Sequence, residues 1–511
     1  MPARAVSPAW LADRIAAGGE WALLDVQEPG PFAAGHCFHA CSVPYSRLEL
    51  SVPALVPRLS TPVILTDGDG GATAGSAARR LCTMGYDNVQ VLEGGNAAWA
   101  GAGQTLFQGV HVPSKTFGEL VEHRLGTPSL EPGELLALRA SGRRVALLDG
   151  RPFDEYRLYT IPGSVCCPNG ELALRAEAMA RDADVLVVNC AGRTRSILGA
   201  ETLRWLLPDR EVYALRNGTQ GWFLAGLEVE RGAARRYPGG VDGEELQAAQ
   251  ARAQAFARRH AVPGVDLAAV RTWLAEEART TYLFDVRTPE EYRDGTLPGA
   301  VHAAGGQLLQ ATDLWIGVPA ARIVLFDEEG VRAPVVAAWL RDMGFDAHSM
   351  RGTPERPVAA GSPQAKPGFD VPRVRSSGLA GWKVLDLRES ASFRAAHVAG
   401  ARWTTRPLLR TVVSHGDRVA FVADDPGIAA LAAVDARESG AASVGWLEDP
   451  VHTESSPADP PDSERIDHVF FTAGRHSGNR AAAEQYLAWE MNLVAQLGPL
   501  EWARFPASWR I

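Results

Sequence analysis

Residues 185–207 read VLVVNCAGRTRSILGAETLRWLL, and they decide how the rest of the chain is interpreted. The run 185–189 is short, apolar and rich in β-branched residues, which is typical of a buried strand. From Ile197 to Leu207 apolar side chains recur at helical spacing, and Pro208 ends the pattern. The stretch therefore predicts a strand, a short loop that opens with Cys190, and a helix.

The loop has the composition of a nucleophile and anion site. Backbone N–H groups at a helix N-terminus have no helical partners, and the helix dipole adds partial positive charge. Arg193 and Arg195 add two full charges. A thiol in such a setting ionises more readily than a free thiol, and the thiolate is the nucleophile. The same loop would hold a small anion. The alternative interpretation is that Cys190 is a small buried apolar side chain.

One pattern recurs four times along the chain. An apolar run ends in Leu-Asp or Phe-Asp, an aromatic residue follows, and a Gly-His, Pro-Gly or related element comes next, before a second strand and helix. Alternating strands and helices predict a mainly parallel α/β sheet flanked by helices in every repeat. Ligands of such sheets bind at the carboxyl ends of the strands, where Cys190 is expected. The four openings are residues 23–28, 147–152, 283–288 and 384–389.

In this order, these motifs resemble the rhodanese (sulfurtransferase) superfamily, and in particular bacterial four-domain thiosulfate sulfurtransferases. The resemblance implies four tandem rhodanese-like domains, each a mainly parallel sheet flanked by helices, plus a C-terminal helical tail. The expected segments are 1–108, 109–235, 236–362 and 363–453 for the domains and 454–511 for a linker and the tail. Only the segment 109–235 contains the loop cysteine, so it is the expected catalytic domain.

The resemblance also implies a reaction. Cys190 would be the catalytic nucleophile that takes a sulfane sulfur from thiosulfate, holds it as a persulfide and passes it to a thiol or cyanide, without a cofactor or metal. Arg151 resembles a family arginine that could contact substrate; the alternative is a structural pairing with Asp149. The other expected substrate-binding residues form the loop itself: Ala191, Gly192, Arg193, Thr194, Arg195 and Ser196.

The other three repeats lack a cysteine at the matching position. The first repeat has Asp67 in this region, the third has Asp327 where the cysteine would stand, and the fourth has Asp424 and Asp425. A carboxylate cannot carry a persulfide, and its charge would repel an anion. The sequence therefore predicts three inactive repeats that serve as scaffold, dimer surface or gate.

Three other functions stay open at this point. The donor could be 3-mercaptopyruvate, although two arginines favour a small dianion. A cysteine phosphatase or arsenate reductase would place an arginine six residues after its cysteine, but Ser196 stands there and Arg195 comes one residue too soon. Finally, the chain could be a non-catalytic scaffold in which Cys190 is incidental.

Composition excludes several further classes. The net charge is −9 and the arginines are scattered, which argues against a nucleic-acid surface. No apolar segment approaches the ~20 residues that span a membrane, and no secretory signal is visible. Six cysteines in 511 residues, with no metal-type spacing, suit a reduced cytoplasmic protein without a metal. The expected partners are a small sulfur donor and acceptor, with neither nucleic acid nor membrane, and a homodimer is left open.

Weaker patterns predict the remaining organisation. Residues 105–131 and 359–372 are expected to be linkers, and residues 244–259 a helix. The run 479–497 predicts an amphipathic helix that docks on a neighbouring domain. Glu171 and Arg175 are expected on a solvated helix face, and the adjacent Cys166 and Cys167 in a core.

Overall fold

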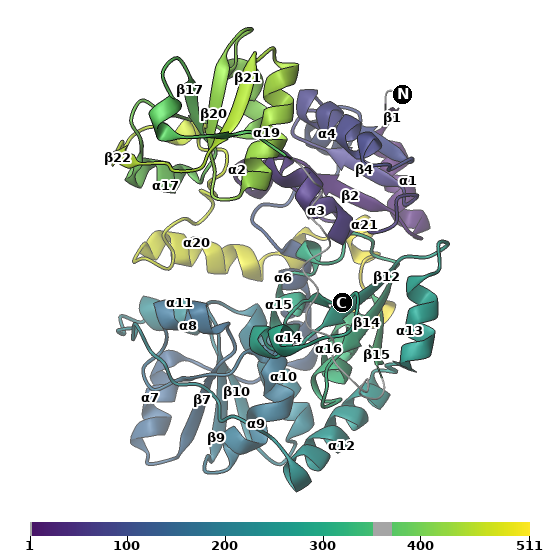
Figure 1. Cartoon of the computed structure of the whole chain (residues 1–511). Coiled ribbons are helices and arrows are strands. Elements are labelled where there is room, and N and C mark those ends of the chain that lie inside the picture. The colour runs from purple at the N-terminus through teal and green to yellow at the C-terminus, as the bar shows by residue number, and fades with distance from the viewer. Residues whose placement is uncertain (1–2, 351–369, 511) are drawn as a thin grey trace. The chain divides into compact units, whose positions relative to one another are not determined.

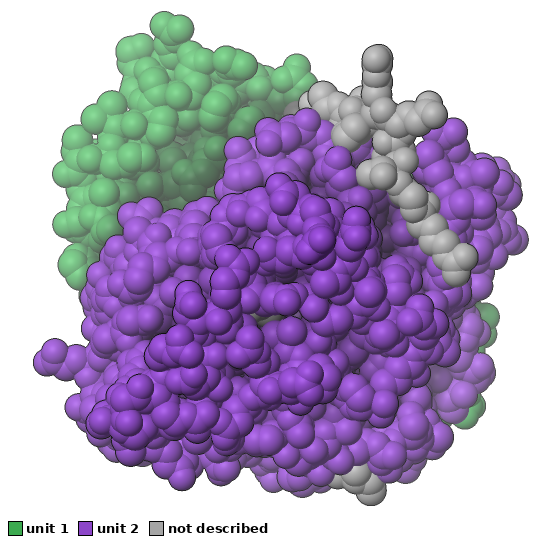
Figure 2. Space-filling view, turned by 90° about the horizontal axis from the view of Figure 1, so that it is seen from below, with its two compact units in different colours: residues 1–13, 21–110, 362–471 green, residues 14–20, 111–361, 472–511 purple. Residues whose placement is uncertain are grey.

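Four sheets built on one plan make up most of the chain. The computed structural model describes residues 3–350 and 370–510, and this part of the chain falls into two compact units (Figure 2). One unit contains residues 3–13, 21–110 and 370–471 and holds the first and fourth sheets. The other contains residues 14–20, 111–350 and 472–510 and holds the second and third sheets with the C-terminal tail.

The first unit pairs the first and fourth repeats (Figure 1). The first sheet has strands β1 (Arg4–Val6), β2 (Ala22–Asp25), β3 (Cys41–Ser42), β4 (Val63–Thr66) and β5 (Val89–Leu92), with helices α1 (Pro8–Ala17), α2 (Pro29–Ala34), η1 (Tyr45–Arg47), α3 (Leu48–Leu55), α4 (Ala72–Thr83) and α5 (Gly95–Gly101). The fourth sheet has β16 (Arg373–Val374), β17 (Lys383–Asp386), β19 (Arg402–Trp403), β20 (Arg418–Val422) and β21 (Ser443–Leu447), with η4 (Ser376–Gly378), α17 (Ser390–Ala395), η5 (Arg406–Leu408), α18 (Leu409–Val412) and α19 (Pro426–Glu438). A separate antiparallel pair joins β18 (His397–Val398) to β22 (His452–Glu454), and η6 (Asp462–Glu464) follows.

The second unit contains the Cys190 repeat. The second sheet has β6 (Ser129–Leu130), β7 (Val145–Asp149), β8 (Val165–Cys166), β9 (Val185–Asn189) and β10 (Glu211–Leu215), with α6 (Val112–Leu125), α7 (Pro132–Ala140), α8 (Phe153–Leu158), η2 (Asn169–Glu171), α9 (Leu172–Ala180), α10 (Thr194–Leu206) and α11 (Gly218–Leu224). The third has β11 (Gly264–Val265), β12 (Thr281–Asp285), β13 (Val301–His302), β14 (Arg322–Phe326) and β15 (Asp346–Met350), with α12 (Gly243–Arg259), α13 (Leu267–Leu274), α14 (Pro289–Asp294), α15 (Gly305–Gln310), η3 (Thr312–Leu314) and α16 (Arg332–Asp342). The tail adds α20 (Arg480–Met491), η7 (Val494–Gln496), α21 (Pro499–Trp502) and η8 (Ala507–Trp509).

The strand order repeats from sheet to sheet. It is β1-β5-β4-β2-β3 in the first sheet, β6-β10-β9-β7-β8 in the second, β11-β15-β14-β12-β13 in the third and β16-β21-β20-β17-β19 in the fourth. Neighbouring strands within these four sheets are parallel, as the alternation of strands and helices predicts. The α/β class and the fourfold repeat are therefore confirmed.

The second sheet is covered on both faces because successive strand side chains point to opposite sides. Leu186 and Val188 of β9 pack with Leu203 of α10 on one face. Val187, between them in sequence, packs with Trp222 of α11 on the other. All five residues of β9 are buried, so the strand is central, as its continuous apolar run predicts (Figure 1).

Buried arginines join the repeats within each unit. In the first unit, Arg406 Nη2 of η5 lies 2.7 Å from Glu49 Oε1. In the second unit, Arg332 Nη1 of α16 lies 2.9 Å from Glu171 Oε1 and 2.7 Å from Glu291 Oε2. The prediction that Glu171 and Arg175 are solvated is therefore wrong. Both are buried, because the helix face that carries them is covered by the third repeat.

The segments between the repeats differ in part from the expectation. Residues 105–131 were expected to be a linker, but they contain the helix α6, whose central residues 114–121 are all buried although several are polar. The helix at 244–259 is confirmed as α12, whereas the expected linker at 359–372 lies almost wholly outside the described residues. Cys166 and Cys167 are both buried, as predicted, and burial raises the pKa of Cys166 to about 12. None of the described helices is both long and apolar enough to cross a membrane.

Candidate active site

Cys190 lies where strand β9 ends and the loop to α10 begins. Its side chain is 2% exposed. The hydroxyl of Ser196, in the first turn of α10, donates a hydrogen bond to Cys190 Sγ over 3.1 Å. The sulfur therefore sits at the carboxyl end of a central strand, beside the open N–H groups of a helix, as the sequence predicts.

Residues of helix α11 donate hydrogen bonds to the backbone carbonyls of the loop. The Thr219 N–H donates to the Cys190 carbonyl over 2.8 Å. The backbone N–H and the side-chain Nε2 of Gln220 both donate to the Ala191 carbonyl over 3.1 Å. Gly218 has φ +52°, and a Cβ there would lie 2.2 Å from the Cys190 carbonyl oxygen, so only glycine allows this close approach. The loop backbone is thus held in one shape.

Arg193 is held by helix α6. Its Nε and Nη2 lie 2.7 and 2.9 Å from the two carboxylate oxygens of Glu119. Nη2 also donates to Glu122, and Nη1 donates to Asn217 Oδ1 over 3.1 Å. These acidic partners raise the pKa of Arg193 against the effect of burial. The guanidinium thus braces the loop, and its contact with substrate stays a prediction.

Arg195 and Arg151 are paired in the same way. Arg195 makes two hydrogen bonds of 2.9 and 2.8 Å to the carboxylate of Glu155. Arg151 is fully buried and donates to both carboxylate oxygens of Asp149, over 2.9 and 2.7 Å, and to the Tyr159 carbonyl. The structural pairing that the sequence left open for Arg151 is therefore present, and its contact with substrate stays a prediction. The loop arginines are not free charges that attract a dianion.

The C-terminal tail covers the loop from a third direction. Thr194 Oγ1 donates to Glu490 Oε1 of α20 over 2.8 Å. A Cβ added to Gly192 would lie 3.1 Å from both Glu490 Oε2 and Tyr486 Cε1. The Tyr486 hydroxyl accepts a hydrogen bond from Lys115 Nζ of α6. The amphipathic helix at 479–497 was expected to dock on a neighbouring domain, and α20 does so within this unit.

Sequence reasoning missed Lys115 and Glu490 as neighbours of the loop, and it took Tyr486 only for an apolar helix position. Lys115 Nζ lies 3.9 Å from Glu490 Oε1, and burial lowers the Lys115 pKa, whereas Glu490 and the Cys190 sulfur favour its charged form. One signal was available: Glu490 follows Tyr486 by four residues and so shares its buried helix face. Nothing in the sequence around Lys115 marks it, because α6 has no apolar periodicity.

The sister loops show what this backbone shape binds. In the third repeat, Asp327 Oδ2 accepts hydrogen bonds from the N–H groups of Val331 and Arg332, and Oδ1 accepts one from Ala333. In the first, the Asp67 carboxylate accepts from Gly70, Gly71 and Ala74. Within the described part of the chain, no side chain accepts from the amides of residues 191–196. The loop N–H groups that bind a carboxylate in the first and third repeats therefore have no such side-chain acceptor in the second repeat.

Comparisons with known proteins agree with this architecture. A model of the rhodanese-like domain matches residues 7–102, 131–225 and 268–353, which is more than half of the chain. The chain belongs to the rhodanese family. The fourth repeat lies outside these matches but has the same strand order, so the fold of four tandem rhodanese-like domains with a helical tail is confirmed.

Two relatives define the similarity further. The crystal structure of thiosulfate sulfurtransferase from Pseudomonas aeruginosa is 38% identical, with a TM-score of 0.92, over 98% of this chain and 99% of that chain. The HTH-type transcriptional regulator Rv0324 of Mycobacterium tuberculosis is 38% identical over 113 residues, 21% of this chain. This chain spans about half the length of that regulator. At the family level, this rhodanese is therefore related to sulfurtransferases.

No metal site accompanies the cysteine in the part of the chain that the structure describes. Three or more His, Cys, Asp or Glu side chains do not gather there as a metal ion would require.

Proposed function

We propose that this rhodanese is a thiosulfate sulfurtransferase whose reaction runs through a persulfide on Cys190. The observation that carries the proposal is a difference between the loops. The carboxylates of Asp67 and Asp327 accept hydrogen bonds from the N–H groups of their own loops. Among the described residues, no side chain accepts from the N–H groups of the loop that follows Cys190. Preorganised N–H donors stabilise negative charge that develops during a reaction. The near full-length similarity to a thiosulfate sulfurtransferase supports the choice of donor.

Two steps complete the reaction. The Cys190 thiolate attacks the outer sulfur of thiosulfate; the bond between the two donor sulfurs breaks, and its electron pair leaves with sulfite. A thiolate or cyanide then attacks the terminal sulfur of the persulfide, and the electron pair of that S–S bond returns to Cys190. The amides of residues 191–196 would hold the transferred sulfur and the departing sulfite. The paired arginines at 193 and 195 keep those amides in place.

We further propose that residues 109–235 form the catalytic domain and that the repeats in 1–108, 236–362 and 363–453 are inactive. The aspartates of the first and third repeats support this assignment, because each already accepts hydrogen bonds from the N–H groups that would hold the substrate anion. These repeats then act as scaffold, and the tail, residues 454–511, contributes α20 to the cover of the loop.

The intact mass of the protein after incubation with thiosulfate tests the proposal. Wild type should gain the mass of one sulfur, removable by cyanide or dithiothreitol, and Cys190→Ser should gain none. Cys82→Ser is the matched control, because Cys82 is an exposed cysteine of the first repeat, and it should load like wild type. An adduct that forms only with 3-mercaptopyruvate would mean that this compound, and not thiosulfate, is the donor. No adduct with either compound would contradict sulfur transfer and favour a scaffold.

A further inference from the structure

Helix α6 places a further cation beside the cysteine loop. Lys115, Gly118 and Glu119 lie three and four residues apart, so they share one face of the helix. This face packs on the loop, because a Cβ added to Gly118 would lie 2.9 Å from Thr194 Cγ2, and Glu119 binds Arg193. The buried Lys115 side chain therefore lies at the same surface of the loop.

Lys115 differs from the loop arginines in the origin of its carboxylate partner. Arg193 and Arg195 are bound by glutamates of α6 and α8, which flank the cysteine loop in the same repeat. Among the described residues, the carboxylate that pairs with Lys115 is that of Glu490, with Oε1 3.9 Å from Nζ, and it comes from the C-terminal tail. Lys115 is thus a cation whose partner can leave while the second sheet and its loop stay in place.

The Glu490 carboxylate shows that an anion fits at this position. Its Oε1 accepts a hydrogen bond of 2.8 Å from Thr194 Oγ1 and faces the Lys115 ammonium. Its Oε2 faces the loop backbone, because a Cβ on Gly192 would lie 3.1 Å from it. Gly192 follows Cys190 by two residues. A hydroxyl and an ammonium therefore bind a carboxylate next to the nucleophile.

Glu490 is an incompletely satisfied occupant of this position. The side chain is 1% exposed, yet Oε2 has no hydrogen-bond partner among the described residues. Burial raises the pKa of Glu119 to about 7 although Arg193 opposes the rise, and repulsion from Glu490 adds to it. A buried charge that lacks hydrogen bonds is costly. Thiosulfate carries more charge and more acceptor oxygens than a carboxylate, so it can compete for the same groups.

The donor must move one of the helices that cover the loop, because Cys190 is 2% exposed. Helix α11 donates hydrogen bonds to the loop backbone, and α6 binds Arg193 through two hydrogen bonds from Glu119. Helix α20 is joined to the loop by the hydrogen bond between Thr194 and Glu490. An anion that replaces the Glu490 carboxylate breaks this bond, so binding of the donor itself releases α20.

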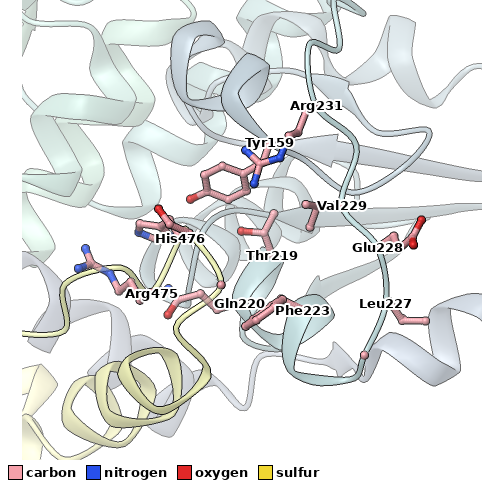
Figure 3. A pocket seen from close by; sticks show the side chains of 13 residues that line it. Tyr159, Thr219, Gln220, Phe223, Leu227, Glu228, Val229, Arg231, Arg475 and His476 are labelled. Atoms are coloured by element: carbon pink, nitrogen blue, oxygen red, sulfur yellow. The ribbon is translucent and has the colours of Figure 1, made fainter. Parts of the chain in front are cut away.

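The segment that leads into α20 borders open space. Residues 475–478 line a cavity of about 460 Å³ together with residues of α11. Figure 3 shows Thr219 of α11 on one side of this cavity and His476 of the tail on the other. Cys190 does not line it, so the cavity is not itself the donor site. It gives this end of the tail room to move away from the loop.

We propose that the Lys115 ammonium and the Thr194 hydroxyl, beside the loop amides, form the subsite for the sulfonate of thiosulfate. Glu490 occupies this subsite until the donor displaces it and α20 withdraws. The inference rests on the proposed function for the identity of the donor. The Cys190 thiolate then attacks the outer sulfur, the bond between the two donor sulfurs breaks, and sulfite leaves the subsite with the electron pair of that bond.

Thiosulfate binding to the Cys190→Ser protein tests the subsite without sulfur transfer. In isothermal titration, the dissociation constant should fall about threefold in Glu490→Gln, because an amide competes less well for a cation than a carboxylate. It should rise about tenfold in Lys115→Met, which removes the cation. Glu484→Gln, on the exposed face of α20, is the control and should bind like the parent. Absence of binding to the parent overturns the proposal.

The double variant Lys115→Met/Glu490→Gln separates binding from a folding defect, because it leaves neither member of this pair as an unpaired buried charge. It should bind thiosulfate about tenfold more weakly than Glu490→Gln alone. Equal affinity of these two proteins overturns the role of Lys115. Unchanged or weaker binding by Glu490→Gln overturns the displacement of Glu490.

Amide hydrogen exchange tests the withdrawal of α20. In the Cys190→Ser protein, saturating thiosulfate should speed exchange in residues 482–491 about tenfold, whereas sodium chloride at equal ionic strength should not. Unchanged or slower exchange overturns the withdrawal. If wild type forms no persulfide, the proposed function fails, whereas the titrations still decide whether the subsite exists. A persulfide on wild type, with equal binding by the parent and Lys115→Met, overturns only this inference.

Discussion

The second and third repeats of this rhodanese share a strand order and a loop, but the hydrogen bonding of the loop differs between them. In the third repeat, the Asp327 carboxylate satisfies three amides of its own loop. In the second, Cys190 stands at the same place, and its sulfur accepts one hydrogen bond from Ser196. The same loop position therefore holds either a carboxylate that accepts hydrogen bonds from the loop N–H groups or a cysteine that receives one from a serine hydroxyl.

A second difference separates the first repeat from the second. Asp149 is paired with Arg151, whose charge keeps the Asp149 pKa low against burial. In the first repeat Gln27 stands in place of that arginine, and burial raises the pKa of Asp25 to about 7. The first repeat therefore lacks the Asp-Arg ion pair that the cysteine repeat has between Asp149 and Arg151.

The largest effect is expected when the second loop is converted into the third. Cys190→Asp should lower sulfur transfer by about 1000-fold or more, because a carboxylate cannot form a persulfide. The new carboxylate should satisfy the loop amides, so the melting temperature should exceed that of Cys190→Ser. Transfer assays and thermal unfolding of both variants measure this. A Cys190→Asp protein less stable than Cys190→Ser would show that the two loops are not equivalent.

The reverse change removes the internal anion of the third loop. Asp327→Ala should lower the free energy of unfolding by about 3 kcal/mol, because three buried N–H groups lose a charged acceptor. Persulfide formation on Cys190 should continue. Chemical denaturation gives the stability, with Glu290→Ala, at an exposed pair with Arg293, as the control. A loss no larger than in that control would mean that Asp327 is not needed to satisfy its loop.

The pH dependence of stability tests the contrast between Asp25 and Asp149. An unfolded aspartate titrates near pH 4, whereas folded Asp25 has a pKa of about 7. Folded Asp25 holds a proton that the unfolded chain has lost, so its contribution is complete below pH 4 and is lost as the pH rises to 7. The whole loss should be about 4 kcal/mol, because the two pKa values differ by about three units and each unit contributes about 1.4 kcal/mol.

Asp25→Asn should remove this pH dependence, and Gln27→Arg should reduce it by supplying the missing cation. Thermal unfolding between pH 5 and pH 8 measures both. If wild type and Asp25→Asn change in parallel over this range, another group is responsible.

The smallest effect concerns the tail. Glu490→Gln removes a buried negative charge near the loop but keeps an oxygen for the Thr194 hydroxyl. The KM for thiosulfate should therefore fall by about threefold, because an anionic donor meets less repulsion. Steady-state kinetics measures this against Glu484→Gln. A higher KM would mean that Glu490 holds the loop in its reactive shape.

Short sequence patterns predicted much of the fold of this protein. The apolar run 185–189, the helical spacing after it and the repeated Leu-Asp openings predicted the central strand, α10 and four similar sheets. These features depend on neighbours along the chain, so local periodicity carries them. Arg193 and Arg195 were recognised as loop residues, but their carboxylate partners were not. Those partners come from α6 and α8, and no local pattern records which distant side chain meets which.

The sequence by itself determined the α/β repeats, the family, and the single repeat whose loop carries a cysteine rather than an aspartate, because each follows from residue order. Only the tertiary structure decided that α6, expected as a linker, and α20 of the tail pack over that loop, and that Lys115, Tyr486 and Glu490 meet beside it. These groups lie up to several hundred residues apart, and only the packing of buried helix faces brings them together.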